Sequence, residues 1–568
     1  MNGLRVEKVQ YEIEMVINMA SEIIDRLLNV TYSFLKGQYS SQELRIISQE
    51  LQKIVKFDIS NYLDKNHKEI SYNETQEVLS KINEKESKQK KNGVFYTPTD
   101  LVKFIYTNTV KAYYDIANPN NLHVLDFNGV PYKSFCYEKT VFDPTCGAGE
   151  FLLVALATKF DVLDLHSDKA TNDSIIKVSK TIYGNDINQE SCIISMIRMY
   201  LYLLNRYGVE RTIGVCKTFK SNFYSYDFIN YNNEINRSFD ILIGNPPYVE
   251  DSKCDTIPLI KYGNVYANVL DNTIKVLKKD GAIGFVIPLS YIATPRMQSI
   301  RDLVYSNFNE QYVLSYCDRP DCLFAGVHQK LCILIGHKNR DSKNNGVYTS
   351  NYNFWYKEER EQLFYRTKTV ANGKIKKEFI PKLGTNIDIS IYDKVTGHEK
   401  DLYKELNYKD YPLYLNMRAA FWIKCFLGEH SSGEYKKFGT RNETMKYFVF
   451  CLLNSSLFWW YWICCSDCWH ITNKELKGFT IPSIPDDITF SKRCKTLARR
   501  MENKLEKTKK YVGTKQTEYE YKHKECINEI HMIDDFINEL YDLTEEESIY
   551  IKNFAYVYRV SGGVLWAQ

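Results

Sequence analysis

Between residues 94 and 340, short apolar segments alternate with longer helical ones, and this alternation constrains the fold more than any other feature. The run "TVFDPTCGAGEFLLVALATKF" indicates a strand, a glycine loop and a helix. "TIYGNDIN" followed by "ESCIISMIRMYLYLLNRYG" repeats that order, and "FDILIGNPPY" adds a further strand. Strands that alternate with helices form a mostly parallel sheet with helices on both faces. We therefore predict an α/β fold built on a doubly wound, Rossmann-like sheet.

The 568 residues exceed the length of one ordinary domain, and the sequence pattern changes along the chain. Residues 1–92 have apolar residues at helical spacing and end in a charged linker, whereas 93–343 hold the alternating pattern. Residues 344–490 show short aromatic stretches and polar loops without a clear period, which favours a separate mixed α/β domain. Residues 491–568 return to charged helical sequence.

The composition favours a soluble globular protein, with 44% apolar and 25% charged residues and a net charge of only +4. This balance excludes a basic coat over the whole surface but allows a local basic groove. The 15 cysteines are scattered, and no apolar run reaches the ~20 residues of a membrane span. We expect a cytoplasmic protein without a membrane association. Cys465 and Cys468, with His470 nearby, lack a fourth ligand, so no metal is expected.

The loop "DPTCGAGEF" (143–151) has the features of a site for an adenosine cofactor. Gly147 and Gly149 allow the backbone to turn tightly and to approach a ligand. The loop lacks the Lys-Ser/Thr ending of a phosphate-binding loop, and Asp143 would repel a pyrophosphate but attract an ammonium group. Asp186 ends the next strand, where a carboxylate can accept both ribose hydroxyls. An ammonium and a ribose without phosphate describe S-adenosylmethionine; a structural turn or a dinucleotide site is the alternative.

The segment "GNPPY" (244–248) ends a strand in an amide, two prolines and an aromatic ring. An amine on a nucleic acid base is a poor nucleophile because its lone pair is delocalised into the ring. Asn245 can offer its side-chain oxygen and Pro246 its carbonyl to the two N–H groups, and Pro247 helps to fix the backbone. Tyr248 can stack on the base. The segment therefore predicts methylation of an amine, with a turn that has no chemical role as the alternative.

Together, "GVFYTP" (93–98), "DPTCGAGEF", "GNDIN" and "NPPY" occur in an order that resembles the gamma-class, TaqI-like N6-adenine DNA methyltransferases of type I and type II restriction-modification systems. The resemblance covers about 94–340 and continues more loosely to 452–482. It implies that 93–343 form the S-adenosylmethionine-dependent methyltransferase domain. It also implies that 344–490 form a target recognition domain.

The resemblance also implies roles for individual residues. Tyr96, Thr97 and Pro98 would line the methionine end of the cofactor, and Asp143 would meet its amino group. Asp186 would bind the ribose and Ile187 would contact the adenine ring. The loop would add further contacts from Pro144, Cys146, Gly147 and Gly149. The residue for the cofactor's adenine amine has no clear match, so Asn222 and Asp227 are both candidates. Phe324 would stack on the face of the flipped adenine opposite Tyr248, or would simply be a core residue.

A paired adenine presents its amine inside the duplex, so the base must be flipped out, which implies double-stranded DNA as the partner. The second region supplies basic and aromatic residues that could contact DNA, although each is more often a solvated surface residue: Lys374, Lys376, Lys377, Arg418, Trp422, Tyr435, Lys436, Lys437 and Arg441. Restriction or phage-defence subunits are possible further partners.

Other activities remain as alternatives. Cytosine-C5 methylation is disfavoured because the chain contains no Pro-Cys pair to supply the thiolate. Methylation of a protein glutamine or of RNA also uses an activated amide or amine. A bifunctional restriction-methylation enzyme would need a nuclease core; Asp64 with Glu86 and Lys88 gives the formal pattern, but the last two lie in the charged linker. A scaffold subunit with an inactive catalytic fold is disfavoured by the intact "NPPY".

Overall fold

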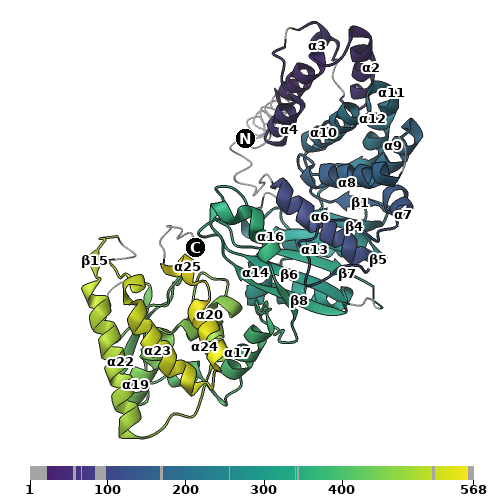
Figure 1. Ribbon diagram of the computed structural model, residues 1–568. Coiled ribbons are helices and arrows are strands. Elements are labelled where there is room, and N and C mark those ends of the chain that lie inside the picture. Colours follow the sequence, from purple (N-terminus) through teal and green to yellow (C-terminus); the bar gives the residue numbers. More distant parts are fainter. Residues whose placement is uncertain are drawn as a thin grey trace, which may run out of the picture. The chain divides into compact units, whose positions relative to one another are not determined.

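The chain divides into two compact units in the computed structural model (Figure 1). The structure describes residues 22–55, 59–65, 67–82, 97–166, 170–254, 256–339, 341, 344–430, 433–514 and 518–560. The first unit holds the described residues up to Pro288 together with 299–313 and 323–347. The second unit holds 289–298, 314–322 and the described residues from Tyr348 onward. Two short segments within the predicted methyltransferase region thus belong to the second unit.

A nine-stranded sheet has the order β3-β2-β1-β4-β5-β7-β6-β8-β9. Its strands are β1 (Val141–Asp143), β2 (Ile182–Asn185), β3 (Phe223–Tyr224), β4 (Phe239–Gly244), β5 (Leu277–Pro288), β6 (Glu310–Tyr316), β7 (Leu331–His337), β8 (Gly346–Asn353) and β9 (Thr369–Ala371). Strands β1 to β5 pair in parallel, with Phe142 opposite Tyr183 on one side and Leu242 on the other. Strand β7 is antiparallel to β5. The predicted α/β fold with a Rossmann-like sheet is confirmed.

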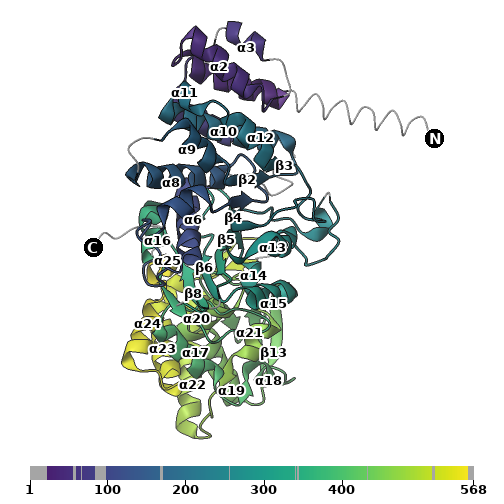
Figure 2. The same cartoon turned by 90° about the vertical axis from the view of Figure 1, so that its right-hand side faces the viewer.

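Helices cover both faces of the parallel strands, which explains why those strands are almost continuously apolar. Every residue of β1, β2 and β4 is buried. Figure 2 shows α6 (Thr99–Tyr113) and α8 (Glu150–His166) on one side of these strands and α12 (Val215–Asn222) and α13 (Val265–Val276) on the other. Helix α6 packs on β4, β5 and β7, and α8 packs on β1 and β2.

The order of the strands creates a switch point between β1 and β4. From β1 the chain proceeds outward to β2 and β3, whereas from β4 it proceeds in the opposite direction to β5. Ligands of open α/β sheets bind in the crevice at the carboxyl ends of the strands at such a point. The "DPTCGAGE" loop follows β1 and the "NPPY" segment follows β4, so the fold brings the two predicted sites to the same edge.

The described part of the N-terminal region is helical, as predicted, and it belongs to the first unit. Residues 22–36 are followed by α2 (Ser41–Leu51), α3 (Ser60–Asp64) and α4 (Tyr72–Ser80). Capping boxes begin α2 and α4, where a serine and the glutamate three residues later bond reciprocally to the backbone. Helix α2 packs on α11 (Val209–Thr212) and α12, and α4 packs on α10 (Gln189–Tyr207).

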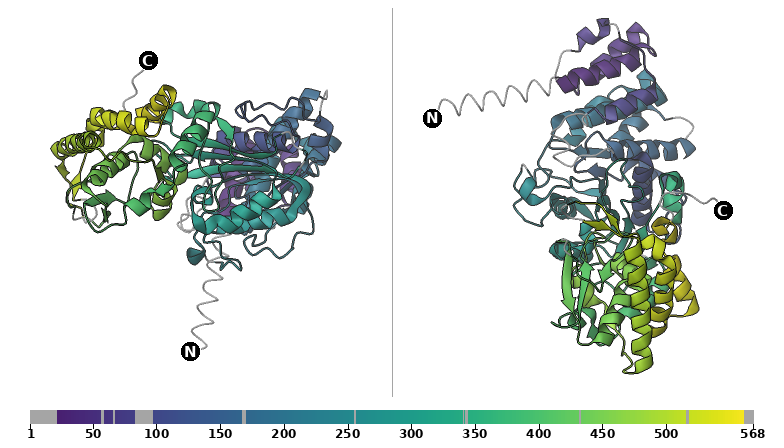
Figure 3. Two further views of the ribbon diagram at one scale, coloured as in Figure 1. Left: turned by 90° about the horizontal axis from the view of Figure 1, so that it is seen from below. Right: turned by 90° about the vertical axis from the view of Figure 1, so that its left-hand side faces the viewer.

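The second unit combines small sheets with a helical core. Strands β11 (Pro412–Asn416), β12 (Cys425–Phe426) and β13 (Tyr435–Gly439) form an antiparallel sheet. The core helices are α19 (Glu443–Leu453), α20 (Ser456–Cys465), α22 (Ile488–Lys507), α23 (Ile527–Leu540) and α24 (Glu545–Asn553). Figure 3 shows the yellow C-terminal helices side by side, and α22 packs on both α19 and α23. The described residues of 348–490 and 491–560 therefore share one unit.

The most apolar helices of the second unit are interior elements. All ten residues of α20, "SLFWWYWICC", are buried. The guanidinium of Arg559 in α25 (Tyr556–Val560) lies between two indoles, 4.2 Å from the ring of Trp422 and 4.1 Å from that of Trp459. Of the helices that the structure describes, none alone is long and apolar enough to span a membrane; α19 and α20 pass that test as a pair, bent by 62°.

Candidate active site at the switch point of the sheet

A hydrogen bond to Asp143 and two glycines with positive φ fix the conformation of the loop after β1. The Asp143 carboxylate, only 2% exposed, accepts the N–H of Thr145 at 3.0 Å. Gly147 has a φ of +51°, and a Cβ placed there would meet no atom within 4 Å, so the loop leaves open space at this point. Gly149 has a φ of +84°, and its Cβ would overlap Ser195 Oγ of α10. The first glycine thus leaves room for a ligand, and the second allows α8 to approach α10.

Asp186 follows β2 and faces the glycine loop. Its Oδ2 accepts the N–H of Gly147 at 2.9 Å, and its Oδ1 accepts the N–H of Asn188 at 2.9 Å. Each carboxylate oxygen has a second lone pair, so Asp186 can still accept two hydroxyl groups of a ligand. The neighbouring Ile187 side chain is 56% exposed, which leaves an apolar surface beside the carboxylate. The structure therefore brings Asp143, Gly147, Asp186 and Ile187 together.

Burial controls the ionisation of the two carboxyl groups. Burial raises the pKa of Asp186 to about 6, against the bonds from Asn188 and Gly147, which lower it. Burial also raises the pKa of Asp143 well above its usual range, and the charge of Asp186 adds to this effect. Two carboxylates held close together in a partly buried site favour a cationic ligand, because a positive charge would allow both to ionise.

Two buried side chains, which are not among the candidates predicted from the sequence, hold this loop by hydrogen bonds to its backbone carbonyls. The Asn185 Nδ2 donates to the carbonyls of Pro144 at 2.9 Å and Tyr226 at 3.1 Å. Arg198 of α10 donates to the Ala148 carbonyl at 2.7 Å. It also forms an ion pair with Glu150 at 2.5 Å. The available signal for Asn185 was an amide as the last residue of a buried strand, where a hydrocarbon side chain is usual.

The two candidates for a contact to the cofactor's adenine amine lie at opposite ends of β3. Asn222 ends α12 and precedes the strand, and its Nδ2 donates to the carbonyls of Ser179 at 3.3 Å and Ile182 at 3.0 Å. Ile182 begins β2, so Asn222 lies at the amino ends of the parallel strands, away from the glycine loop. Asp227 follows β3 and is half-buried, on the carboxyl side of the strand. Position in the sheet therefore favours Asp227 over Asn222.

Asn245 lies at the carboxyl end of β4 with its amide held in one orientation. Its Nδ2 donates to Thr97 Oγ1 at 3.1 Å, and Thr97 is buried. The Oδ1 of Asn245 is buried and has no hydrogen-bond partner among the residues that the structure describes. The preceding Gly244 has no room for a Cβ, which would lie 2.8 Å from Asp143 Oδ1. An unused amide oxygen thus belongs to the residue directly after a glycine that packs against the carboxylate of the glycine loop.

The prolines and the tyrosine complete the segment. Pro246 is buried and Pro247 is half-buried, so the backbone after Asn245 is restricted at two successive residues. The Tyr248 hydroxyl donates to the Val286 carbonyl of β5 at 2.7 Å, which fixes the ring while it remains half-buried. Such a site can present two acceptors and a flat aromatic face to an amine on a planar ring.

Two other predicted residues are less accessible or not described. Phe324 is only 1% exposed and lies in a tight turn, in which the N–H of Val327 donates to the Phe324 carbonyl at 3.0 Å. Its predicted stacking on a base remains a prediction that requires this turn to move. Tyr96 lies outside the described residues, whereas Thr97 and Pro98 directly precede α6. Within the described ranges, no group of three or more His, Cys, Asp or Glu side chains is placed to hold a metal ion.

Several of the basic residues proposed for DNA contact in the second unit already have partners. Three form ion pairs there: Lys374 with Asp393 at 2.6 Å, Arg418 with Glu434 at 3.3 Å and Arg441 with Glu405 at 3.5 Å. Trp422 packs on Arg559 and is half-buried. Lys436 and Lys437 of β13 remain exposed.

Comparison with known families agrees with this geometry. Residues 77–379, more than half of the chain, match the sequence profile of the family N-6 DNA Methylase. The chain belongs to the N-6 DNA methylase family. The match includes the glycine loop, the strand that ends in Asp186 and the "NPPY" segment of this N-6 DNA methylase.

Individual relatives are distant. The chain is 25% identical over 241 residues to the type II methyltransferase M.VspI of Vibrio sp. (strain 343), which covers 41% of this chain and 46% of that protein. It is 21% identical over 322 residues to the type II restriction enzyme and methyltransferase RM.Eco57I of Escherichia coli, covering 48% of this chain and 31% of that protein. This N-6 DNA methylase thus spans less than half the length of these relatives.

Among solved structures, the type IIL restriction-modification enzyme MmeI in complex with DNA is similar to this N-6 DNA methylase with a TM-score of 0.49 and 12% sequence identity. That match covers 90% of both chains.

Proposed function

We propose that this N-6 DNA methylase is a site-specific DNA methyltransferase that transfers a methyl group from S-adenosylmethionine to the exocyclic N6 amine of a flipped adenine. The observation that carries the proposal is Asn245 Oδ1, a buried and unused acceptor at the switch point of the sheet. The preceding residue, Gly244, packs against Asp143, so the segment with the amine acceptor adjoins the proposed cofactor site. Membership of the family supports the assignment of the reaction to DNA adenine.

The residues at the sheet edge fit S-adenosylmethionine, which supplies an electrophilic methyl group when bound. Asp186 would accept the two ribose hydroxyls, because both its oxygens keep a free lone pair. Ile187 would cover the adenine ring with its exposed side chain. Asp143 would hold the ammonium group, and the open space at Gly147 allows the backbone to approach the ligand. We assign the contact to the cofactor's adenine amine to Asp227.

Asn245 and Pro246 would activate the target amine. The Asn245 Oδ1 would accept one N–H of the adenine amine and the Pro246 carbonyl the other, which favours a pyramidal nitrogen with an available lone pair. As the nitrogen gains positive charge in the transition state, the two acceptors stabilise it in fixed positions. Because Thr97 accepts from the amide nitrogen, the amide oxygen would face the amine. The ring of Tyr248, fixed by its bond to Val286, would stack on the base.

DNA cleavage by the same chain is the second candidate, since RM.Eco57I is named as both a restriction enzyme and a methyltransferase. The proposed nuclease pattern rests on Asp64, Glu86 and Lys88, and the last two lie outside the described residues. Only 31% of RM.Eco57I is covered by the match. We therefore propose methylation as the activity of the site at the switch point of the sheet.

The proposal is tested by incubating the purified chain with S-adenosylmethionine and duplex DNA of mixed sequence, then measuring the nucleosides of the digested DNA by mass spectrometry. We expect N6-methyladenine to accumulate, without 5-methylcytosine. Methylation of RNA or of a glutamine peptide, with DNA unmodified, would instead assign the site to another amine or amide substrate.

The pKa of Asp186 predicts how cofactor binding depends on pH. Its folded-state pKa of about 6 means that the carboxylate needed for the ribose is present above pH 6 and is lost below it. Affinity for S-adenosylmethionine should therefore fall by about tenfold between pH 7 and pH 5, measured by calorimetry. In Asp186→Asn, affinity for S-adenosylmethionine should be lower at every pH. The decrease in affinity that comes from protonation of residue 186 should be absent.

A further inference from the structure

Helix α22 concentrates the positive charge of the chain. Its 20 residues, "ITFSKRCKTLARRMENKLEK", contain seven Lys or Arg and two Glu, a net charge of +5, whereas the whole chain carries +4. The rest of the chain is therefore close to neutral. Nothing in the motifs of the proposed active site accounts for this helix.

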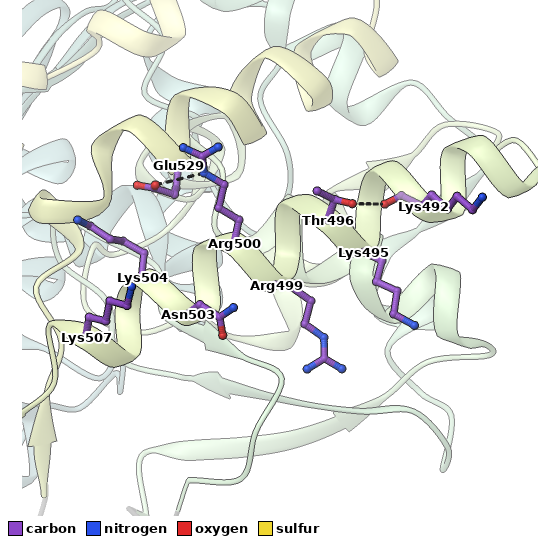
Figure 4. A pocket seen from close by; sticks show the side chains of 9 residues that line it. All are labelled: Lys492, Lys495, Thr496, Arg499, Arg500, Asn503, Lys504, Lys507 and Glu529. Atoms are coloured by element: carbon purple, nitrogen blue, oxygen red, sulfur yellow. Dashed lines mark hydrogen bonds and ion pairs between the residues drawn. The ribbon is translucent and has the colours of Figure 1, made fainter.

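The basic residues form a stripe along the solvent side of α22. The buried side of the helix carries Phe490, Cys494, Leu497, Ala498, Met501 and Leu505 and packs on α19 and α23. The opposite side lines a groove of about 720 Å³, formed by Lys492, Lys495, Thr496, Arg499, Arg500, Asn503, Lys504 and Lys507 with Glu529 of α23. Figure 4 shows these side chains along the helix from Lys492 to Lys507, with Arg500 turned toward Glu529. We call the six basic residues of this groove the α22 stripe.

Four of the six residues of the α22 stripe, Arg499 among them, form no ion pair with a described carboxylate. Among the residues that the structure describes, Lys492, Lys504 and Lys507 form no ion pair within 4 Å. Lys495 pairs with Glu443 at 3.1 Å, but both side chains are at least half exposed, so this pair contributes little and is easily exchanged. The carboxylates near the groove therefore do not neutralise the stripe.

The spacing of the stripe is unfavourable for an isolated helix. Lys495 and Arg499 are four residues apart, as are Arg500 and Lys504, so like charges face each other on successive turns. Such pairs destabilise a helix by about 0.2–0.5 kcal/mol each. Lys504 and Lys507 complement the helix dipole at its C-terminal end, but Lys492 and Lys495 lie too far toward the N-terminus to do so. The stripe therefore favours an external polyanion over a role in stability.

We propose that the α22 stripe binds the phosphate backbone of duplex DNA. The inference rests on the proposed function, which requires DNA to be held while a base is flipped. From Lys492 to Lys507 the stripe is about 22 Å long at 1.5 Å per residue. One strand of B-DNA presents a phosphate every 3.4 Å of its axis, so the stripe matches about six phosphates.

Phosphate contacts position a protein on DNA without reading its sequence. The α22 stripe consists of Lys and Arg side chains on one regular helix. The other residues of α22 in the groove, Thr496 and Asn503, have short polar side chains. It should therefore contribute equally to binding of a cognate site and of any other duplex. Sequence reading is left to other residues of the chain.

The test measures DNA binding by fluorescence anisotropy over a range of salt concentrations, with the full-length protein. The variant Lys492→Gln, Lys504→Gln, Lys507→Gln removes three unpaired charges and keeps helix propensity. The slope of log affinity against log salt should become shallower by about 2 to 3, and affinity at 0.1 M salt should fall by about 10- to 100-fold for cognate and non-cognate duplexes alike. Affinity for S-adenosylmethionine should not change. Lys492→Gln alone, which lies far from the C-terminal end of α22, should make the slope of log affinity against log salt shallower by about 1.

Two matched variants control for charge and fold. Lys68→Gln, Lys180→Gln, Lys217→Gln removes the same charge from exposed positions of the first unit and should leave the slope nearly unchanged. Arginine at positions 492, 504 and 507 keeps the charge and should preserve binding. An unchanged slope in the glutamine variants, with DNA methylated normally by the wild-type protein, would overturn the α22 assignment alone and favour an acidic protein segment as the occupant. Failure of the wild-type protein to bind any DNA would overturn both this inference and the proposed function.

Discussion

Asn245→Ala is expected to lower the rate of methyl transfer by about 10³-fold while S-adenosylmethionine binding is retained. The substitution removes Oδ1, the buried acceptor that has no other partner among the described residues, and leaves the glycine loop and Asp186 in place. An interaction used mainly in the transition state affects kcat more than cofactor affinity. Single-turnover kinetics with duplex DNA and calorimetry with the cofactor measure the two effects separately.

Two further variants distinguish the role of the Asn245 acceptor oxygen from that of Thr97, which holds the amide. Asn245→Asp keeps acceptor oxygens at this position and should retain part of the activity. Thr97→Val removes only the acceptor for Asn245 Nδ2, and should reduce kcat by about tenfold because the amide is no longer held in one orientation. Turnover of Asn245→Ala within tenfold of the wild type would contradict the proposed role of the amide.

Asp186→Ala is expected to weaken S-adenosylmethionine binding by about 10³-fold. The ligand would lose two hydrogen bonds to a charged group, each worth about 1.5–3 kcal/mol. The loop would also lose the bond from Gly147 N–H, which helps to fix the glycine turn. Methylation should recover substantially at saturating cofactor, since Asp186 does not contact the amine in this account.

Asp173→Ala is a suitable control, because it removes a carboxylate with a 76% exposed side chain that pairs with a lysine one turn away. Its affinity for the cofactor should equal that of the wild type. Unchanged affinity in Asp186→Ala, by contrast, would place the cofactor site elsewhere in the chain.

The sequence was sufficient to locate the two loops of the site because both follow buried strands and both contain residues with special backbone requirements. Glycines after β1 and a proline pair after β4 have few structural explanations, and the alternation of strands and helices placed their loops at one edge. The sequence pattern therefore predicts the amide and the two carboxylates as functional candidates without knowledge of their contacts. The α/β class followed from the same alternation.

Contacts across the structure could not be predicted in this way. Asn222 and Asp227 are both candidates because the family's acidic residue has no clear match, but a shift of a few residues moves a side chain to the opposite edge of the sheet. The hydrogen bond from Asn245 to the Thr97 hydroxyl joins residues 148 positions apart, and the expected contact of Thr97 with the cofactor stays a prediction. The roles of Asn185 and Arg198 as braces depend equally on long-range packing.

Charge in the second region was also difficult to assign from sequence. The basic residues of 344–490 are natural candidates, but Lys374, Arg418 and Arg441 each form an ion pair with a carboxylate. The stripe on α22 looks like an ordinary charged helix in the sequence, because its buried side is visible only once α19 and α23 pack against it. Whether a basic side chain is paired with a carboxylate depends on residues that are distant in the chain. Pairing is one feature that distinguishes an ordinary charged surface from a surface that can bind an anion.

The most direct test of the account is single-molecule sequencing of DNA from a host without its own DNA methylases, expressing either the wild-type chain or Asn245→Ala at matched levels. We expect N6-methyladenine at nearly every copy of one short sequence with the wild type and unmodified DNA with the variant. Absence of methylated adenine with soluble, cofactor-binding wild-type protein, or equal methylation by the variant, would contradict it.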